Sequence, residues 1–192
     1  MFIVFEGIDG AGKSTLIKGM QAELATLSIS HIVTREPGGT QLGDEIRQLL
    51  LRCQGETPLP RTELLLYEAG RAQHVDFVIR PALAKKQWVL CDRYSASSVA
   101  FQCGGRGLDK TKVDWLNEFA TDGLKPDLCV LLDLSVAESQ RRREHRDADR
   151  FEREKTEFHE RVRQSYLAQL GEDRKRWFKL DAATSPEAGL KS

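Results

Sequence analysis

The segment FIVFEGIDGAGKST, residues 2–15, decides the fold of this chain. It opens with the apolar run Phe2–Phe5, which is typical of a strand buried on both faces. It leads into the stretch Lys13–Leu27, where leucines and a methionine recur three and four residues apart and predict an amphipathic helix. The connection between them, Gly7–Gly12, holds three glycines. The segment is therefore predicted to form a strand, a glycine-rich loop and a helix.

The loop, residues 7–14, matches the pattern G-x-x-x-x-G-K-[ST]. Its glycines let successive backbone N–H groups turn inward around a phosphate, and the N-terminus of the following helix favours negative charge. Lys13 supplies a positive charge for the β- and γ-phosphates, and the Ser14 hydroxyl supplies a Mg²⁺ ligand. The sequence therefore predicts a site for a nucleoside triphosphate. The residues expected to bind it are Gly7, Ile8, Asp9, Gly10, Ala11, Gly12, Lys13, Ser14 and Thr15.

The composition limits the other roles that the chain can have. Its 192 residues, of which 40% are hydrophobic, suit one domain spanning residues 1–192. The 29 basic and 29 acidic residues balance, which disfavours a partner such as a nucleic acid polymer. No apolar run approaches the roughly 20 residues that cross a bilayer, so no membrane association is expected. Four cysteines without metal-binding spacing predict reduced thiols and a cytoplasmic location.

Four further apolar runs predict strands, namely His31–Thr34, Trp88–Cys91, Leu128–Leu132 and, more weakly, Trp177–Leu180. They alternate with longer amphipathic stretches, which indicates an α/β fold: a five-stranded parallel sheet flanked by helices. A polar or charged residue follows each predicted strand. Ligands bind beyond the carboxyl ends of strands in open parallel sheets, so these residues are expected near the site. They are Glu6, Arg35, Asp92, Asp133 and Asp181.

Three classes of nucleotide-binding protein are consistent with the loop: a GTPase switch, a small-molecule or nucleotide kinase, and a binding module without catalysis. A GTPase needs an Asn-Lys-x-Asp motif, but the single asparagine, Asn117, lies in Leu-Asn-Glu-Phe. A motor ATPase usually needs a larger body. A kinase needs a second site for an acceptor and arginines that neutralise the transferred phosphoryl group. The sequence offers candidates for both.

The candidates for the acceptor site each have two interpretations. Asp92 and Arg93 follow a predicted strand and could form a structural ion pair, or hold Mg²⁺ and an acceptor phosphate respectively. Tyr67 and Arg71 lie four residues apart on a helix predicted from Arg61 to about Ile79, before Pro81. They could pack at the edge of the core, or they could stack on a base and bind its edge.

The charged run 138–161 mixes both signs and also has two interpretations. It could be a solvated helix with ion pairs four residues apart, or a functional segment. Arg143, Arg146 and Arg150 are spaced by three and four residues, so a helix through this run would present all three on one face.

Taken together, these motifs closely resemble the thymidylate kinase family, in its bacterial type. The resemblance covers nearly the whole chain. The second, third and fourth pieces named below separate this family from adenylate, guanylate and shikimate kinases. The matching pieces are residues 5–15 (FEGIDGAGKST), 34–40 (TREPGGT), 92–94 (DRY), 101–107 (FQCGGRG), 126–128 (PDL) and 149–152 (DRFE).

The resemblance implies a P-loop nucleoside monophosphate kinase domain that transfers a phosphoryl group from MgATP to dTMP, giving dTDP and ADP in dTTP biosynthesis. It implies a phosphate loop at 7–14 and a short lid at about 141–153. The expected catalytic residues are Lys13, Arg93, Asp9, Arg146, Arg143 and Arg150, with Arg146 as the main lid donor. The expected metal ligands are Ser14 and Asp92. The expected substrate-binding residues are Asp9, Arg35, Tyr67, Arg71, Arg93, Ser97, Ser98, Phe101 and Gln102.

Two alternatives remain within the kinases: a deoxynucleoside kinase and another small-molecule P-loop kinase. A deoxynucleoside kinase has little use for two arginines at an acceptor phosphate, so Arg35 and Arg93 favour the monophosphate. The phosphate loop carries Gly10 where some thymidylate kinases carry an arginine, so the catalytic cation is expected from the lid. The resemblance also implies a homodimer.

Overall fold

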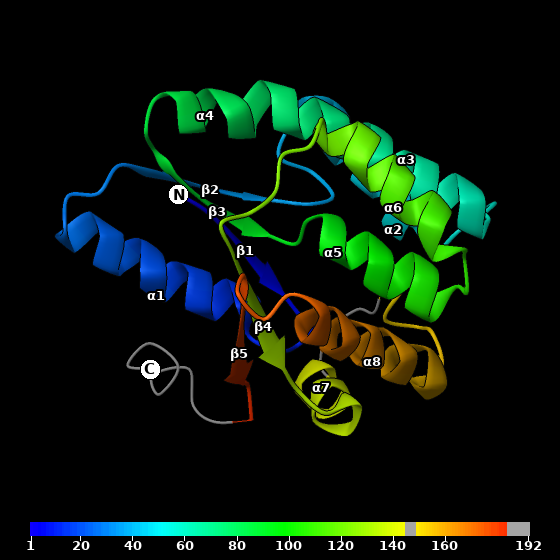
Figure 1. Ribbon diagram of the computed structural model, residues 1–192. Coiled ribbons are helices and arrows are strands. Elements are labelled where there is room, and N and C mark those ends of the chain that lie inside the picture. The colour runs from blue at the N-terminus through cyan, green and yellow to red at the C-terminus, as the bar shows by residue number, and fades with distance from the viewer. Residues whose placement is uncertain (145–148, 184–192) are drawn as a thin grey trace.

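The five strands form one parallel sheet in the order β2-β3-β1-β4-β5 (Figure 1). The structure, a computed structural model, describes residues 1–144 and 149–183. All five predicted strands are confirmed, and each extends one residue further, to the polar residue at its carboxyl end. The strands are β1 (Phe2–Glu6), β2 (His31–Arg35), β3 (Trp88–Asp92), β4 (Leu128–Asp133) and β5 (Trp177–Asp181).

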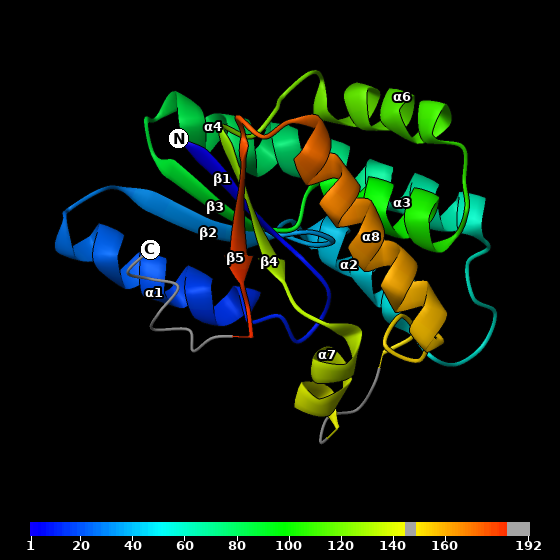
Figure 2. The same ribbon diagram turned by 60° about the horizontal axis from the view of Figure 1, so that its bottom comes forward.

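Helices cover both faces of the sheet (Figures 1 and 2). Successive strand side chains point to opposite faces. In β1, Phe5 belongs to a buried cluster that includes residues of α1 (Lys13–Thr26), whereas Val4 belongs to a second cluster with Val75 and Ile79. The predicted apolar run is therefore buried on both sides, as in other parallel sheets.

The remaining helices surround this sheet, and none in the described part of the chain is long and apolar enough to span a membrane. They are α2 (Gln41–Leu51), α3 (Pro60–His74), α4 (Arg80–Ala84), α5 (Ser95–Ser98), α6 (Lys110–Thr121), α7 (Val136–Arg143) and α8 (Thr156–Glu172), with the π-helical segments η1 (Val75–Ile79) and η2 (Val99–Gly105).

The helix predicted from Arg61 to about Ile79 does not end before Pro81, so this prediction is wrong. The α3 helix continues through the π turn η1 into α4, and the helical path ends only at Ala84. Pro81 lies in the first turn of α4, directly after the π turn η1, so the backbone N–H that it lacks falls where the helical hydrogen-bond pattern changes. A proline in this place is therefore compatible with a continuing helix.

The interpretation of the charged run as one continuous helix is also wrong. Helix α7 ends at Arg143, and Arg150 lies in a separate turn. The carboxylate of Asp149 accepts hydrogen bonds from the backbone N–H groups of Phe151 and Glu152, each at 2.9 Å. This local bonding favours a turn over a helix. Arg143 and Arg150 therefore do not share a helical face.

Candidate active site

The phosphate loop has the shape that its glycines predict. Gly7 has a φ of 133°, and a Cβ there would collide with the backbone of Leu132 on β4. Gly12 caps α1 with a φ of 95°, and the helix begins at Lys13. The Lys13 ammonium donates to the carbonyl oxygens of Gly7 at 3.0 Å and Ile8 at 3.2 Å. The Lys13 side chain therefore folds back onto the phosphate loop.

A cavity lies over this loop and reaches the carboxyl ends of β2 and β3. It brings together predicted nucleotide-binding residues and the predicted metal ligands, whereas Gly7, Ile8 and Ala11 are buried within the loop. We call it the phosphate cavity. The predicted residues that line it are Asp9, Gly10, Gly12, Lys13, Ser14, Thr15, Arg35, Asp92 and Arg93, and it is also lined by Glu36, Arg47, Arg142, Asp149 and Glu152.

A second cavity adjoins the first, and we call it the acceptor cavity. Every predicted substrate-binding residue except Arg35 lines it, although these residues come from the loop after β1, from α3 and from the segment β3–α5–η2. The residues that both cavities share are Asp9, Glu36, Arg47, Arg93 and Asp149. The other residues of the acceptor cavity are Pro37, Leu51, Tyr67, Arg71, Ser97, Ser98, Phe101, Gln102 and Phe151.

Arg93 lies at the junction of the two cavities. Its Nη2 donates to the Asp9 carboxylate at 2.7 Å, and its guanidinium lies 5.0 Å from the centre of the Phe101 ring. Burial alone would raise the pKa of Asp9, but the positive charges of Arg93 and Lys13 hold it well below the usual range. Asp9 is therefore a carboxylate at neutral pH. The φ of Arg93 is 71°, a left-handed conformation that is unfavourable for an arginine.

Arg71 is a buried residue rather than one at the edge of the core. Its side chain is 1% exposed, and its Nε donates to Glu36 at 2.7 Å while Nη1 donates to Glu68 at 2.7 Å. Burial would lower the pKa of Arg71, but these two carboxylates raise it, so the guanidinium stays charged. Nη2 carries two hydrogens, of which one is donated to the carbonyl oxygen of Tyr94. Arg71 therefore lines the acceptor cavity with a fixed orientation.

The walls of the acceptor cavity are aromatic on one side and polar on the other. The Tyr67 ring lies 6.2 Å from that of Phe151, and burial raises the pKa of the Tyr67 phenol, which stays neutral. On the polar side, the Ser98 hydroxyl donates to Glu68 at 2.9 Å, and the Gln102 amide donates to a buried glutamate at 2.9 Å. This combination suits a flat ring with polar edges.

Arg35 and Arg47 add positive charge to the phosphate cavity. Arg35 is exposed and lies 3.7 Å from Asp44, whereas Arg47 donates to the carbonyl oxygen of Pro37 at 3.0 Å. Burial lowers the pKa of Arg47, and the nearby charge of Arg35 lowers it further. Arg47 was not among the residues predicted from the sequence. A usable signal was its place on α2, because Thr40 marks the start of the helix and the spacing of Ile46 and Leu50 marks its inward face, beside which Arg47 lies.

Asp92 has an incomplete set of partners. Its Oδ1 is buried and has no hydrogen-bond partner among residues 1–144 and 149–183. Asp92 pairs with Phe5 of β1 on one side and with Arg35 of β2 on the other in the sheet register, and it lines the phosphate cavity together with Ser14. A buried carboxylate oxygen beside a hydroxyl suits a hard cation or its bound water.

The lid arginines divide into different environments. Arg143 is buried and packs against the phosphate loop, since a Cβ on Gly10 would lie 3.4 Å from its Cγ. Arg150 instead donates to the Leu50 carbonyl oxygen at 2.8 Å and to Glu63 at 2.6 Å. Arg150 is therefore engaged away from the phosphate loop. Arg146 lies outside the described residues.

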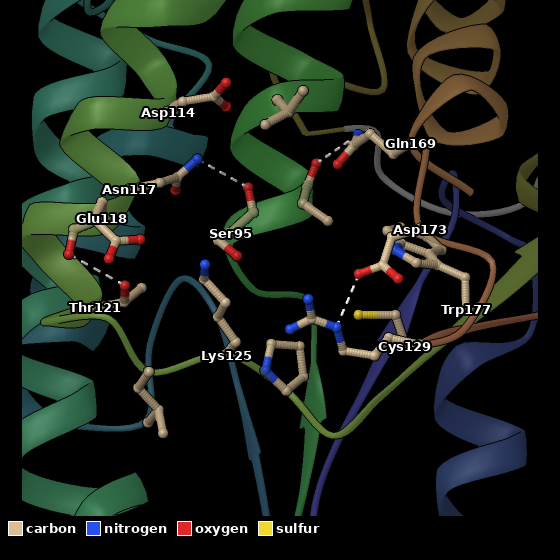
Figure 3. A pocket seen from close by; sticks show the side chains of 15 residues that line it. Ser95, Asp114, Asn117, Glu118, Thr121, Lys125, Cys129, Gln169, Asp173 and Trp177 are labelled. Carbon is tan, nitrogen blue, oxygen red and sulfur yellow. Dashed lines mark hydrogen bonds and ion pairs between the residues drawn. The ribbon is translucent and has the colours of Figure 1, made fainter. Parts of the chain in front are cut away.

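A third cavity lies behind α5, between α6 and α8 (Figure 3). Asn117 separates it from the acceptor cavity: its Oδ1 accepts from Arg71 Nη1 at 2.8 Å, and its amide donates to the Ser95 carbonyl oxygen at 3.3 Å. None of the predicted site residues that the structure describes lines this cavity. The predicted substrate-binding residues and metal ligands therefore lie in the first two cavities.

Comparison with known proteins gives a family for this arrangement. The family model for thymidylate kinase matches residues 5–191. The chain belongs to the thymidylate kinase family. A thymidylate kinase of Bdellovibrio bacteriovorus is 59% identical over 99% of this chain and 92% of its own, and one of Geotalea daltonii is 44% identical over 96% and 90%.

The fold agrees with that of a solved thymidylate kinase. The crystal structure of the enzyme from Ehrlichia chaffeensis matches with a TM-score of 0.78 and 32% sequence identity, over 94% of this chain and 86% of that one. The resemblance to the thymidylate kinase family and the predicted parallel α/β fold are therefore confirmed.

Proposed function

We propose that this thymidylate kinase family member transfers the γ-phosphoryl group of MgATP to dTMP, giving dTDP and ADP for dTTP biosynthesis. One observation carries the proposal: the phosphate cavity and the acceptor cavity meet at Asp9 and Arg93. A phosphoryl group can pass directly between two bound nucleotides only if their phosphates share such a junction.

The acceptor cavity supports a deoxynucleoside monophosphate of a pyrimidine. Tyr67 stacks on the base, and the fixed guanidinium of Arg71 donates to its edge, with Ser98 and Gln102 beside it. Phe101 crowds the sugar and leaves no room for a ribose 2′-hydroxyl. Ser97 lines the sugar side of the cavity.

Four charged groups serve the acceptor phosphate and sugar. Arg93 binds the phosphate from the junction, with Arg35 and Arg47 nearby in the same cavity. The ionised Asp9 carboxylate accepts from the 3′-hydroxyl of the sugar. Together they hold the attacking oxygen in line with the bond that breaks.

The donor is held by the phosphate loop. Lys13 leaves the carbonyl oxygens of Gly7 and Ile8 and binds the β- and γ-phosphates, where negative charge increases during transfer. Ser14 and Asp92 would hold Mg²⁺ or its water, consistent with the Asp92 carboxylate oxygen that has no hydrogen-bond partner within the described residues. When bound, Mg²⁺ neutralises charge on the phosphate oxygens. Arg143, which packs beside the loop, supplies the lid cation.

A deoxynucleoside kinase is the rival within the same fold. It would accept thymidine, whose 5′-hydroxyl carries no phosphate. Arg35, Arg47 and Arg93 are three of the four arginines among the described residues that line the phosphate cavity, and a nucleoside has no phosphate to pair with their charges. The monophosphate is therefore favoured as acceptor.

The test is a coupled assay of ADP release with ATP and a panel of acceptors: dTMP, UMP, CMP, AMP, GMP and thymidine. We expect the kcat/KM for dTMP to exceed that for UMP by at least about tenfold, because a hydroxyl without a partner costs about 1–3 kcal/mol. Arg93→Ala is the matched variant and is expected to lose dTMP turnover. Equal efficiency with UMP, or turnover of thymidine at the rate of dTMP, would contradict the proposal.

We further propose that the enzyme is a homodimer in the cytoplasm. Helix α3 exposes Leu65, and helix α6, which packs against it, exposes Trp115 and Phe119, whose rings stack at 5.8 Å. Exposed aromatic clusters of this kind favour association between protein surfaces. The four cysteines, all in described residues, are not joined by disulfides, which is consistent with a reducing compartment.

A further inference from the structure

A buried carboxylate lies directly behind Arg93, on the side away from Asp9. It belongs to Glu6, the last residue of β1, whose side chain is fully buried. Its Oε2 accepts the hydroxyl protons of Ser97 at 2.7 Å and Tyr166 at 2.8 Å. Its Oε1 accepts from the backbone N–H of Tyr94 at 2.9 Å. Three donors therefore satisfy a carboxylate that has no contact with solvent.

The carboxylate attracts both hydroxyl protons, and the two hydroxyl oxygens also lie 2.9 Å from each other, where either group can donate to the other. A hydroxyl has one proton, so a proton donated to Glu6 leaves the oxygen to act as an acceptor elsewhere. Arg93 uses those oxygens: its Nη1 donates to the Tyr166 oxygen at 3.0 Å and to the Ser97 oxygen at 3.4 Å. With their protons directed toward Glu6, the two hydroxyl oxygens thus accept hydrogen bonds from the Arg93 guanidinium.

Three contacts restrain the guanidinium of Arg93. Asp9 binds Nη2, the Phe101 ring lies against the guanidinium plane, and the hydroxyl pair holds Nη1. Such restraint is needed because the backbone of Arg93 is strained, with a φ of 71°. A free arginine side chain would otherwise sample many rotamers.

We propose that Tyr166 is a positioning residue for Arg93, and that Glu6 directs the Tyr166 hydroxyl toward this role. The inference rests on the proposed function, in which Arg93 binds the acceptor phosphate. Tyr166 does not reach the substrate itself; it sets the direction in which the guanidinium presents its donors.

The helix that carries Tyr166 also supports the segment after Arg93. Gln169, three residues further along α8, donates its side-chain amide to the Ala96 carbonyl oxygen at 3.2 Å (Figure 3). Tyr166 and Gln169 thus lie on one face of α8 and contact α5 side by side. Helix α8 begins at Thr156, soon after the lid, so one element links the lid to the acceptor arginine.

The test compares the affinities for dTMP and for thymidine, which differ only in the phosphate, measured by titration calorimetry. Arg93→Ala gives the loss of phosphate recognition that follows from removing this guanidinium, while Arg35 and Arg47 remain in the cavity. In Tyr166→Phe, which keeps the ring, we expect the affinity for dTMP to fall about tenfold, as for one hydrogen bond to a charged group. The affinity for thymidine should change less than about twofold, and the kcat for dTMP should fall with its affinity.

Tyr94→Phe is the matched control, because it also removes one buried hydroxyl, which donates to the Leu124 carbonyl oxygen at 3.2 Å. It is expected to lower the melting temperature without changing the ratio of the two affinities. Ser97→Ala removes the second, longer contact to Arg93 and should lower the ratio of the dTMP affinity to the thymidine affinity by less than Tyr166→Phe does. If Tyr166→Phe does not fold, Ser97→Ala still tests the inference.

Three outcomes would overturn the inference. An unchanged affinity ratio in Tyr166→Phe, with Arg93→Ala defective, would overturn the positioning role and leave the proposed function standing. An equal fall in Tyr94→Phe would show that any lost buried hydroxyl has this effect. An unchanged ratio in Arg93→Ala would overturn both the role of Arg93 in the proposed function and the inference that depends on it.

Discussion

At the scale of single residues, Gly10 and Arg143 complement each other. Gly10 has a φ of 77°, and a Cβ on it would lie 3.1 Å from the Ser139 carbonyl oxygen. The space beside the loop is instead filled by the aliphatic part of Arg143, whose Nε donates to that same oxygen at 3.2 Å. The loop therefore leaves room for a cation that comes from helix α7.

We expect Arg143→Ala to lower kcat at least about 100-fold, within the range known for arginines that stabilise phosphoryl transfer. The KM for dTMP should change less than about threefold, because the contact forms chiefly in the transition state. Arg141→Ala is the control: Arg141 is on the same helix but is 68% exposed and pairs with Glu138. Coupled ADP-release kinetics on both variants check this, and equal effects would reject the role of Arg143.

At the scale of elements, η2 and α8 pack so closely that glycines are required between them. A Cβ on Gly105 would collide with the Phe158 ring, and one on Gly104 would lie 2.7 Å from Cβ of Ser165. The sequence FQCGGRG thus contributes to packing as well as to the site. Close contact here keeps α8, and with it Tyr166, against the segment that follows Arg93.

Gly105→Ala is therefore expected to reduce the free energy of unfolding by about 1–3 kcal/mol, the usual effect of overpacking a core. Gly171→Ala provides the comparison, since it lies in α8 with nothing within 4 Å of a built Cβ. It should raise that free energy by up to about 1 kcal/mol. Urea denaturation of both variants measures the two changes in the free energy of unfolding. Changes of the same sign and size would show that Gly105 does not pack tightly against Phe158.

The elements that the sequence predicts well are those defined by local apolar patterns. The five strands and α1 follow from runs and spacings alone, as the FIVF run before the phosphate loop illustrates. The charged run could not be predicted in the same way, because spacing alone does not reveal that Asp149 forms a turn. The helical path from α3 into α4 continues past Pro81 because of the π turn η1, which has no clear sequence signal.

At the scale of the whole molecule, the apolar surface of α6 has a consequence for assembly. Trp115 and Phe119 are 65% and 74% exposed, and they lie four residues apart on one face. We expect the double variant Trp115→Glu, Phe119→Glu to elute as a monomer, because charges placed in an apolar interface oppose association. Light scattering with size-exclusion chromatography measures the mass.

Leu27→Glu is the control for this experiment. Leu27 is 66% exposed at the end of α1, far from α6 (Figure 1), so the same kind of change there should leave the mass unaltered. A wild-type protein that already elutes as a monomer at micromolar concentration would contradict the proposed dimer, as would an unchanged mass in the double variant.

The site could be predicted in part because its residues follow strands that end at one edge of the sheet. Eight of the nine predicted substrate-binding residues line one cavity, and Arg35 lines the adjoining one. Glu6 and Tyr166 could not be found in this way, since they are separated by 160 positions and meet only in the fold. The pairing of Arg71 with Glu36 and Glu68 likewise depends on tertiary structure.

The left-handed backbone of Arg93 sets two contributions to stability in opposition at one position. Glycine adopts a φ of 71° without strain, whereas a residue with a Cβ loses about 1–2 kcal/mol there. The arginine side chain, however, pairs with the Asp9 carboxylate and donates to Tyr166, and its removal would leave Asp9 without that partner, a loss that outweighs the relieved strain. A library screened only for heat tolerance would therefore retain arginine despite the strained backbone, as would a library screened for growth.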